Sequence, residues 1–117
     1  MKPGDVLLVA FPKVDLRQGK LRPALMLAAM PGRHEDILMA MISSKTHQFI
    51  IGFDEFIKET DPDFTMTGLK QTSVIRLSRL ATIQKRIIPA KLGEIDEARL
   101  TAIYDRLCDF LESLKSA

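Results

Sequence analysis

The sequence predicts a mainly β (β-rich α+β) fold, in which a small, strongly bent antiparallel sheet or barrel carries one C-terminal amphipathic helix. Short apolar runs separated by turn residues fill the first three-quarters of the chain, about ten residues apart. After Gly93 the apolar residues recur at steps of three and four, which is typical of a helix. The runs lie too close together for the helical crossovers that a parallel sheet requires.

Strands are expected over residues 5–88. The predicted strands are residues 6–11, 24–29, 37–42 and 49–53, then 73–77 with 78–83 as its continuation or as a further strand, and the short segment 87–88. The first three runs are rich in Leu, Met and Ala, which also suit a helix, but their length and the Pro and Gly residues at their ends favour strands. Residues 54–63 form an acidic connection with a turn at Asp61-Pro62-Asp63.

The helix is predicted over residues 96–115. Asp96 can cap its first turn through the carboxylate, and Glu97 follows where the helix dipole favours negative charge. The apolar stripe consists of Leu100, Ile103, Leu107, Phe110, Leu111 and Leu114. We therefore expect one face of the helix to cover another part of the molecule.

Length and composition limit the class of protein. The 117 residues predict one domain spanning 1–117, and a hydrophobic fraction of 46% argues against intrinsic disorder. The single cysteine, Cys108, cannot form an internal disulfide or a structural zinc site, and we expect it to be a small buried residue of the helix. No apolar run reaches the roughly 18 residues that cross a bilayer, and residues 1–5 do not resemble a signal peptide, so we expect a cytoplasmic protein without membrane contact.

The charges are unevenly distributed although the net charge is only +2. Residues 70–91 contain six basic and no acidic residues, whereas residues 54–69 contain five acidic residues and one lysine. In a barrel, the basic first loop and the strand around Arg76 and Arg79 could converge on one positive groove. The acidic segments would then face elsewhere.

The loop 12–23 is the first candidate site. It contains Lys13, Arg17, Lys20 and Arg22 against the single acid Asp15. Pro23 restricts Arg22 to extended backbone, so its guanidinium would project from the start of a strand and could bind a phosphate through two parallel hydrogen bonds. An ordinary surface arginine is the alternative.

A second candidate site follows the third predicted strand. Ser43 and Ser44 can orient a phosphate or sugar, or can hydrogen-bond the turn backbone, and Lys45 and His47 come next. Further along, Arg76, Ser78 and Arg79 indicate either a positive strand face or a solvated one. His34 and His47 have no cysteine near them, so no metal site is predicted.

Several short segments together resemble the MazF/PemK toxin family of type II toxin-antitoxin systems. The segments are Gly4-Asp5-Val6-Leu7-Leu8-Val9, Lys20-Leu21-Arg22-Pro23-Ala24-Leu25, Ile42-Ser43-Ser44, Thr72-Ser73-Val74-Ile75 and Leu92-Gly93-Glu94-Ile95. Their order and spacing extend over nearly the whole chain. The resemblance implies an SH3-like curled antiparallel barrel, a homodimer, no cofactor or metal, and cleavage of single-stranded RNA.

The resemblance also implies roles for individual residues. Arg22 and Ser43 match the catalytic pair of the family: the arginine stabilises the phosphorane formed when a ribose 2′-hydroxyl attacks phosphorus, and the hydroxyl holds a phosphate oxygen. The predicted RNA contacts are Lys13, Arg17, Lys20, Ser44, Lys45, Arg76 and Ser78. The expected protein partner is an antitoxin whose acidic, flexible segment occupies the basic groove.

The sequence departs from one family pattern. A PemK-type subset carries Arg-x-Asp on the strand after the Ser73-Val74 step and a histidine in the first loop, but here the strand reads Arg76-Leu77-Ser78 and residues 12–21 contain no histidine. The general base is therefore unassigned: His47, four residues beyond Ser43, is a candidate substitute, and an ordinary loop histidine is the alternative. The missing carboxylate also keeps open a non-catalytic alternative on the same fold, a CcdB-like toxin or a nucleic-acid-binding module, and a housekeeping barrel remains a third possibility.

Overall fold

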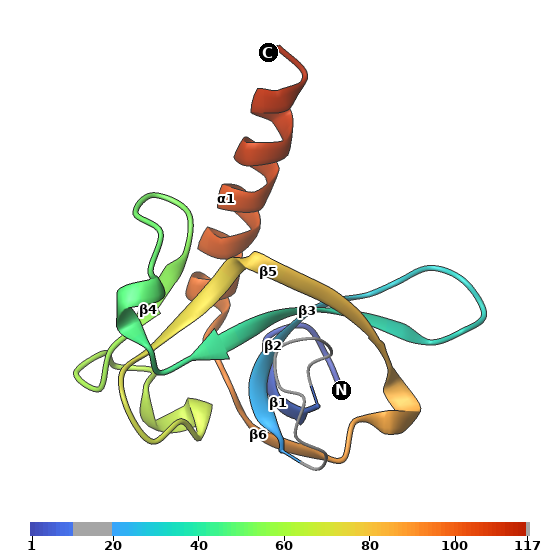
Figure 1. Ribbon diagram of the computed structural model, residues 1–117, viewed down its shortest axis with the longest axis horizontal. Coiled ribbons are helices and arrows are strands. Elements are labelled where there is room, and N and C mark those ends of the chain that lie inside the picture. Colours follow the sequence, from blue (N-terminus) through green and yellow to red (C-terminus); the bar gives the residue numbers. More distant parts are fainter. Residues whose placement is uncertain (11–19, 117) are drawn as a thin grey trace.

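A six-stranded antiparallel sheet forms the body of the protein in the computed structural model, which describes residues 1–10 and 20–116. The strands are β1 (Asp5–Val9), β2 (Arg22–Ala29), β3 (Asp36–Ser43), β4 (Glu55–Ile57), β5 (Ser73–Gln84) and β6 (Ala90–Glu94). They pair in the order β4-β5-β3-β2-β1-β6. Figure 1 shows the sheet curled into an open half-barrel, with the long strand β5 arching over it. The predicted mainly β fold class is confirmed.

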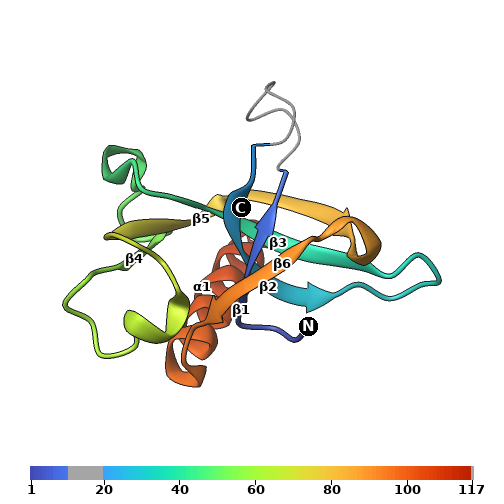
Figure 2. The ribbon, with the colours of Figure 1, turned by 90° about the horizontal axis from the view of Figure 1, so that it is seen from below.

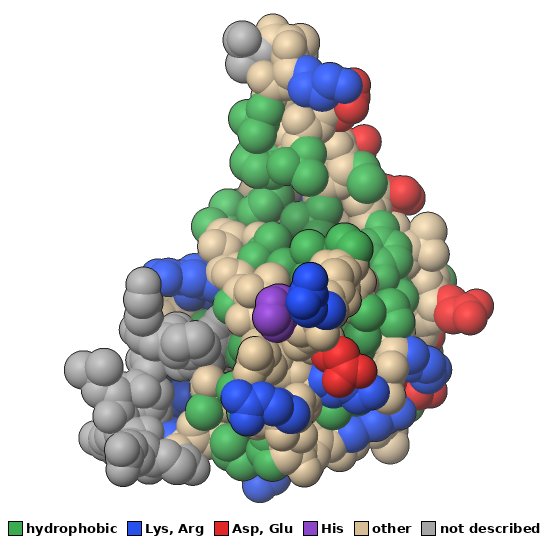
Figure 3. Space-filling view, turned by 90° about the vertical axis from the view of Figure 1, so that its right-hand side faces the viewer, with side chains coloured by type: hydrophobic (Ala, Val, Ile, Leu, Met, Phe, Trp, Pro, Cys, Tyr) green, Lys and Arg blue, Asp and Glu red, His purple; other side chains and the backbone are tan. Residues whose placement is uncertain are grey.

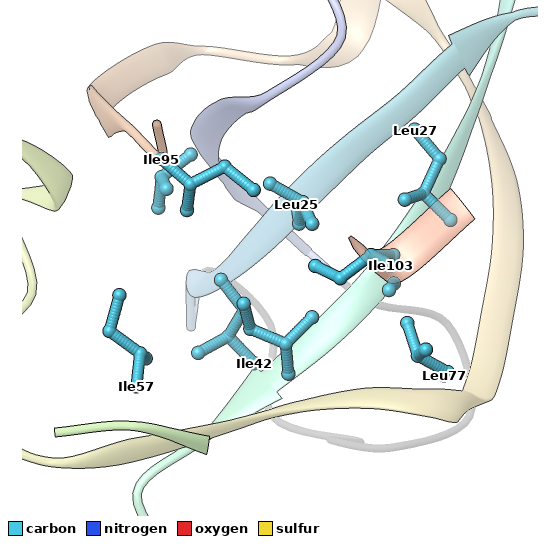
Figure 4. Packing of buried hydrophobic residues seen from close by; sticks show 10 residues of the cluster. Leu25, Leu27, Ile42, Ile57, Leu77, Ile95 and Ile103 are labelled. Carbon is cyan, nitrogen blue, oxygen red and sulfur yellow. The ribbon is translucent and has the colours of Figure 1, made fainter. Parts of the chain in front are cut away.

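Both faces of the central strands are buried. On the helix side, one cluster includes Val6, Leu25, Ile42 and Ile103, and Figure 4 shows how such side chains from different strands meet the helix. Inside the curl, a second cluster contains Leu7, Val9, Ala24, Met26, Ile37, Met39, Met41, Ile83 and Ile88. Neighbouring residues of one strand therefore enter different clusters. This explains why β1, β2 and β3 appear in the sequence as continuous apolar runs without polar alternation.

Helix α1 (Glu97–Leu114) begins where the sequence predicts. The Asp96 carboxylate accepts a hydrogen bond from the Arg99 backbone N–H at 2.8 Å and caps the first turn. Ile103 is fully buried against the sheet, and the Tyr104 hydroxyl donates to the Leu27 carbonyl oxygen. The C-terminal half projects beyond the sheet (Figure 1). No helix among the described residues is long and apolar enough to cross a membrane.

Arg99 joins the helix to the acidic connection. Its guanidinium donates to both oxygens of Asp63 at 2.8 and 2.9 Å, to Asp61 at 3.0 Å and to Glu55 at 2.8 Å. Hydrogen bonds from Arg99 lower the pKa of Asp63. The pKa of Asp61 is lowered mainly by the hydrogen bond from the Lys58 backbone N–H and to a smaller extent by Arg99. The acidic segment is thus an anchoring surface for the first turn of α1.

Two predicted strands are wrong. Residues 49–53 form a turn in which Gly52 has φ 78° and the Asp54 carboxylate accepts from the Ile50 N–H, and the strand β4 follows it instead. Residues 87–88 lie at the end of a 3-10 turn, η3 (Lys85–Ile87), and the last strand begins only after Pro89. Leu92 and Gly93 lie inside β6. Cys108, expected to be buried, is exposed.

The segment before β5 is pressed against β6. A 3-10 turn, η2 (Thr65–Thr67), lies beside the end of β6 (Figure 2) and leads into Gly68 with φ 73°. A Cβ at Gly68 would overlap the Leu92 carbonyl oxygen, and a Cβ at Gly93 would overlap the Met66 carbonyl oxygen. Only glycine permits this approach of the two backbones, which fixes the path of the following residues.

Candidate active site

The pairing of β2 with β3 brings Arg22 and Ser43 together. Ala24 pairs with Met41, and continuing this register by two residues places Arg22, the first residue of β2, opposite Ser43, the last residue of β3. Directly opposed residues of an antiparallel pair point to the same face. Both side chains are half-buried and line one pocket of ≈ 320 Å³.

Local chemistry places each side chain at the strand end. Pro23 follows Arg22 and also lines the pocket, so the arginine is held in extended backbone at its rim. The Ser43 hydroxyl oxygen accepts a hydrogen bond from the Lys45 backbone N–H at 3.1 Å. A hydroxyl that accepts one hydrogen bond still has its own proton to donate. Ser43 can therefore donate to an anionic oxygen in the pocket.

The segment between η2 and β5 supplies another wall of the pocket. Gly68, Leu69, Lys70 and Gln71 all line it, and Leu92 of β6 lies behind them. Sequence reasoning did not select Lys70 or Gln71 as site residues. The one available signal was that Lys70 opens the segment without acidic residues. Its place in the pocket depends on the contact between Gly68 and β6, which no local pattern reveals.

The other predicted residues near the strand ends divide into two groups. Ser44 lines the pocket with Ser43. Lys20, Lys45 and His47 are exposed and do not line it, with His47 in the 3-10 turn η1 (Thr46–Gln48). Lys13 and Arg17 lie outside the described residues.

Arg76 and Ser78 lie on β5, at increasing distance from the pocket along the sheet. Arg76 pairs with Met41, a pocket residue, and its guanidinium donates to the Gln48 side-chain oxygen at 3.3 Å. Ser78 lies in an irregular stretch of β5, where its backbone N–H and hydroxyl both meet one Asp54 carboxylate oxygen at 3.3 Å. The Asp54 carboxylate therefore lies next to Ser78. The same carboxylate accepts a hydrogen bond from the Ile50 N–H, so it stabilises the turn before β4.

The composition of the pocket suits an anion with an apolar part. Its described lining contains two cations, Arg22 and Lys70, several hydroxyl and amide groups, and no carboxylate. Leu8, Leu69 and Leu92 provide apolar surface, which strengthens electrostatic attraction by excluding water. Among the described residues no group of three or more His, Cys, Asp or Glu side chains is arranged to hold a metal ion.

The comparison with family models identifies the family of the chain, and the comparison with solved structures finds the same fold. A family model described as PemK-like, MazF-like toxin of type II toxin-antitoxin system matches residues 2–111. The fold is similar to that of the Mycobacterium tuberculosis toxin MazF-mt6, with a TM-score of 0.63, 16% identity, and coverage of 95% of this chain and 97% of that chain. It is also similar to an endoribonuclease in complex with its cognate antitoxin from mycobacterial species, with a TM-score of 0.62, 17% identity, and coverage of 96% and 95%. The comparison with curated proteins gives no match.

Proposed function

Since the chain belongs to the PemK-like, MazF-like toxin family of type II toxin-antitoxin systems, we propose that it is a metal-independent endoribonuclease that cleaves single-stranded RNA. The observation that carries this proposal is the meeting of Arg22 and Ser43 in one pocket at the ends of β2 and β3. A guanidinium beside a hydroxyl offers several donors to phosphate oxygens.

The proposed reaction uses the RNA's own nucleophile. The ribose 2′-hydroxyl attacks the adjacent phosphorus, the bond to the 5′-oxygen of the next nucleotide breaks, and the products are a 2′,3′-cyclic phosphate and a 5′-hydroxyl. Negative charge builds on the non-bridging oxygens during attack, so fixed donors stabilise the transition state more than the substrate. Arg22 donates to these oxygens and protonates the leaving oxygen, and Ser43 donates to one of them.

We propose that His47 accepts the proton of the 2′-hydroxyl. A histidine is well suited to accept a proton near neutral pH, and His47 follows Ser43 by four residues in η1. A His47→Ala variant should cleave more slowly, because the group that accepts the 2′-hydroxyl proton is lost. An unchanged kcat would remove His47 from the mechanism.

RNA binding is proposed to extend from the pocket along the neighbouring basic and hydroxyl side chains. Ser44 shares the pocket, Arg76 pairs with the pocket residue Met41, and Lys20 and Lys45 flank the two strand ends. Lys13, Arg17 and Ser78 complete the predicted set. Because these are phosphate contacts for the most part, affinity should fall as salt concentration rises.

An antitoxin is the proposed protein partner. One structural neighbour is an endoribonuclease in complex with its cognate antitoxin. A pocket with two cations and no carboxylate among its described lining residues would attract an acidic, flexible segment as it attracts RNA. We therefore expect the antitoxin to compete with RNA for this pocket.

A homodimer is proposed through the projecting half of α1. Phe110, Leu111 and Leu114 are 45%, 59% and 55% exposed. Figure 3 shows hydrophobic side chains continuing from the helix onto the body beneath it. Contiguous apolar surface of this kind marks a protein interface, and a second copy would cover it.

The test is cleavage of a labelled single-stranded RNA by purified protein in the presence of EDTA. Wild-type protein should produce fragments ending in a cyclic phosphate, and Arg22→Ala should lower the rate at least about a hundredfold. Lys115→Gln, at the far end of α1, is the matched control and should cleave normally. Toxicity on expression with intact RNA would favour the non-catalytic, CcdB-like alternative instead.

A further inference from the structure

The second cation of the pocket has a role of its own. We propose that Lys70 is a substrate-binding residue whose ammonium group holds a phosphate of the single-stranded RNA, from a different wall of the pocket than Arg22 and Ser43. The proposal rests on the RNA-cleaving function proposed above. It extends that function to a residue that lies 48 positions beyond Arg22 in the sequence.

The backbone on both sides of Lys70 is fixed by side-chain hydrogen bonds. The Leu69 N–H donates to the Thr67 hydroxyl oxygen at 3.1 Å, and Thr67 itself is fully buried and donates to the Phe64 carbonyl at 2.6 Å. On the other side, the Ser73 hydroxyl donates to the Gln71 carbonyl oxygen at 2.9 Å. Lys70 thus lies between two anchored residues, and binding need not order its main chain.

The whole segment is also held against β6. Gly68 and Gly93 permit a backbone approach that any other residue would obstruct. This contact places residues 69–71 near the end of the sheet at which β2 begins and β3 ends. There they line the pocket together with Arg22 and Ser43. The position of Lys70 is therefore a consequence of the fold.

Among the described residues, no carboxylate neutralises the charge of Lys70. Lys91 pairs with Asp5 at 3.1 Å and with Glu94, and Lys115 pairs with Glu112 at 3.6 Å. Lys70, by contrast, makes no ion pair with any carboxylate of residues 1–10 and 20–116. An exposed, unneutralised ammonium on a fixed loop beside a second cation suits an RNA phosphate.

The experiment measures RNA affinity as a function of salt. The probe is a mixed-sequence single-stranded oligonucleotide with 2′-O-methyl riboses, which lacks the attacking hydroxyl and stays intact. For single strands, each phosphate contact contributes about 0.7 to the slope of log affinity against log salt concentration. Lys70→Gln should reduce the slope by about 0.7 and weaken binding at low salt roughly tenfold, while Lys70→Arg should restore both. The control Lys115→Gln should match wild type.

The outcomes separate this inference from the function on which it rests. A wild-type slope in Lys70→Gln, with RNA cleavage by wild-type protein intact, would overturn the role of Lys70 alone. A reduced slope together with no cleavage of unmodified RNA by wild-type protein would overturn the nuclease and support phosphate binding by Lys70. If the wild-type protein does not bind the oligonucleotide, both proposals are overturned.

Discussion

At the residue scale, the candidate site depends on where two strands end. Arg22 and Ser43 are 21 positions apart in the sequence, yet the register that pairs Ala24 with Met41 sets them opposite each other. The donor groups are therefore fixed by main-chain hydrogen bonds of the sheet. A site fixed in this way needs little reorganisation when charge develops on a phosphate.

Replacement of Ser43 tests whether its hydroxyl acts as a donor. Ser43→Ala should lower the rate of RNA cleavage at least about a hundredfold, because a transition-state donor is lost. Ser43→Thr keeps the hydroxyl and adds a methyl group, and should retain most of the activity. Equal losses in the two variants, measured as kcat on one labelled RNA, would mean that the side chain at residue 43 serves packing and not phosphate binding.

Sequence patterns predict part of the candidate site. Local patterns single out Arg22 and Ser43, an Arg-Pro step before an apolar run and a serine pair after one, and the family resemblance implies their catalytic roles. Lys70 was not selected, because its position depends on the contact of Gly68 with Leu92, which are 24 residues apart. The hydrogen bond between Ser78 and Asp54 also joins residues 24 positions apart, so no local pattern predicts it.

At the element scale, the contact between the segment after η2 and β6 supports one wall of the pocket. Gly68 and Gly52 both have a positive φ, 73° and 78°, but a Cβ at Gly52 would meet nothing within 4 Å. Gly52→Ala should therefore cost about 1 kcal/mol of folding stability through backbone strain alone. Gly68→Ala should cost roughly 1–3 kcal/mol more, because its Cβ meets the Leu92 carbonyl.

Urea denaturation of the two variants measures this difference. The comparison is matched, since both substitutions place alanine in left-handed backbone. Equal midpoints would show that the segment can move away from β6 at little cost. In that case the wall that carries Lys70 would not be fixed by glycine packing.

The Arg99 anchor should make stability depend on acid pH. The pKa of Asp63 is lowered in the folded state by hydrogen bonds from Arg99, so its ionised form is favoured by folding. The resulting stabilisation is complete above the ordinary pKa of 3.8 and is lost as pH falls through the lower folded-state pKa. Asp63→Asn should lower stability at pH 7 and weaken this acid dependence.

The measurement is the urea midpoint from about pH 6 down to about pH 2, with Asp105→Asn as the control. Asp105 is exposed on α1 and its replacement should leave the curve unchanged. A wild-type acid dependence in Asp63→Asn would show that the anchor gains nothing from this carboxylate.

The predicted strands and helix are correct where an apolar segment is long and has clear turn or cap residues at its ends. Strands β1, β2, β3 and β5 and the helix were found because turn residues or an N-cap define their ends. The prediction for segment 49–53 failed because its two phenylalanines make ring contacts without strand pairing. The ring centroids of Phe49 and Phe56 lie 4.3 Å apart, and those of Phe53 and Phe110 lie 5.0 Å apart. β4 was missed because its three residues are too few for a pattern.

At the scale of the whole molecule, the basic segment 70–91 is divided among several regions. Lys70 lines the pocket, and Arg76 pairs with the pocket residue Met41. Lys85 lines a smaller pocket of ≈ 210 Å³, and Lys91 is paired with Asp5 and Glu94. The positive charge near the candidate site therefore comes from a few residues of separate segments. A charge run in the sequence did not specify a charged patch in space.

The proposed dimer surface is tested by charge placed on α1. Leu111→Glu and Leu114→Glu alter side chains that are 59% and 55% exposed, so the single chain should still fold. Both should shift the protein toward monomer in sedimentation velocity, because a buried glutamate opposes association. The control Ile87→Glu, at a side chain 58% exposed in η3, should leave the dimer intact. A monomeric wild type would refute the proposed interface.

RNA cleavage by the proposed pair of Arg22 and Ser43 can be tested in cells. Its most direct test is the mapping of new RNA 5′ ends in cells after induced expression of wild type, Arg22→Ala and Ser43→Ala, with matched protein levels. Wild type should produce new 5′-hydroxyl ends at recurring sequences, and both variants should lose them. The same new ends in all three strains, or no new ends with a toxic wild type, would refute cleavage by this pair.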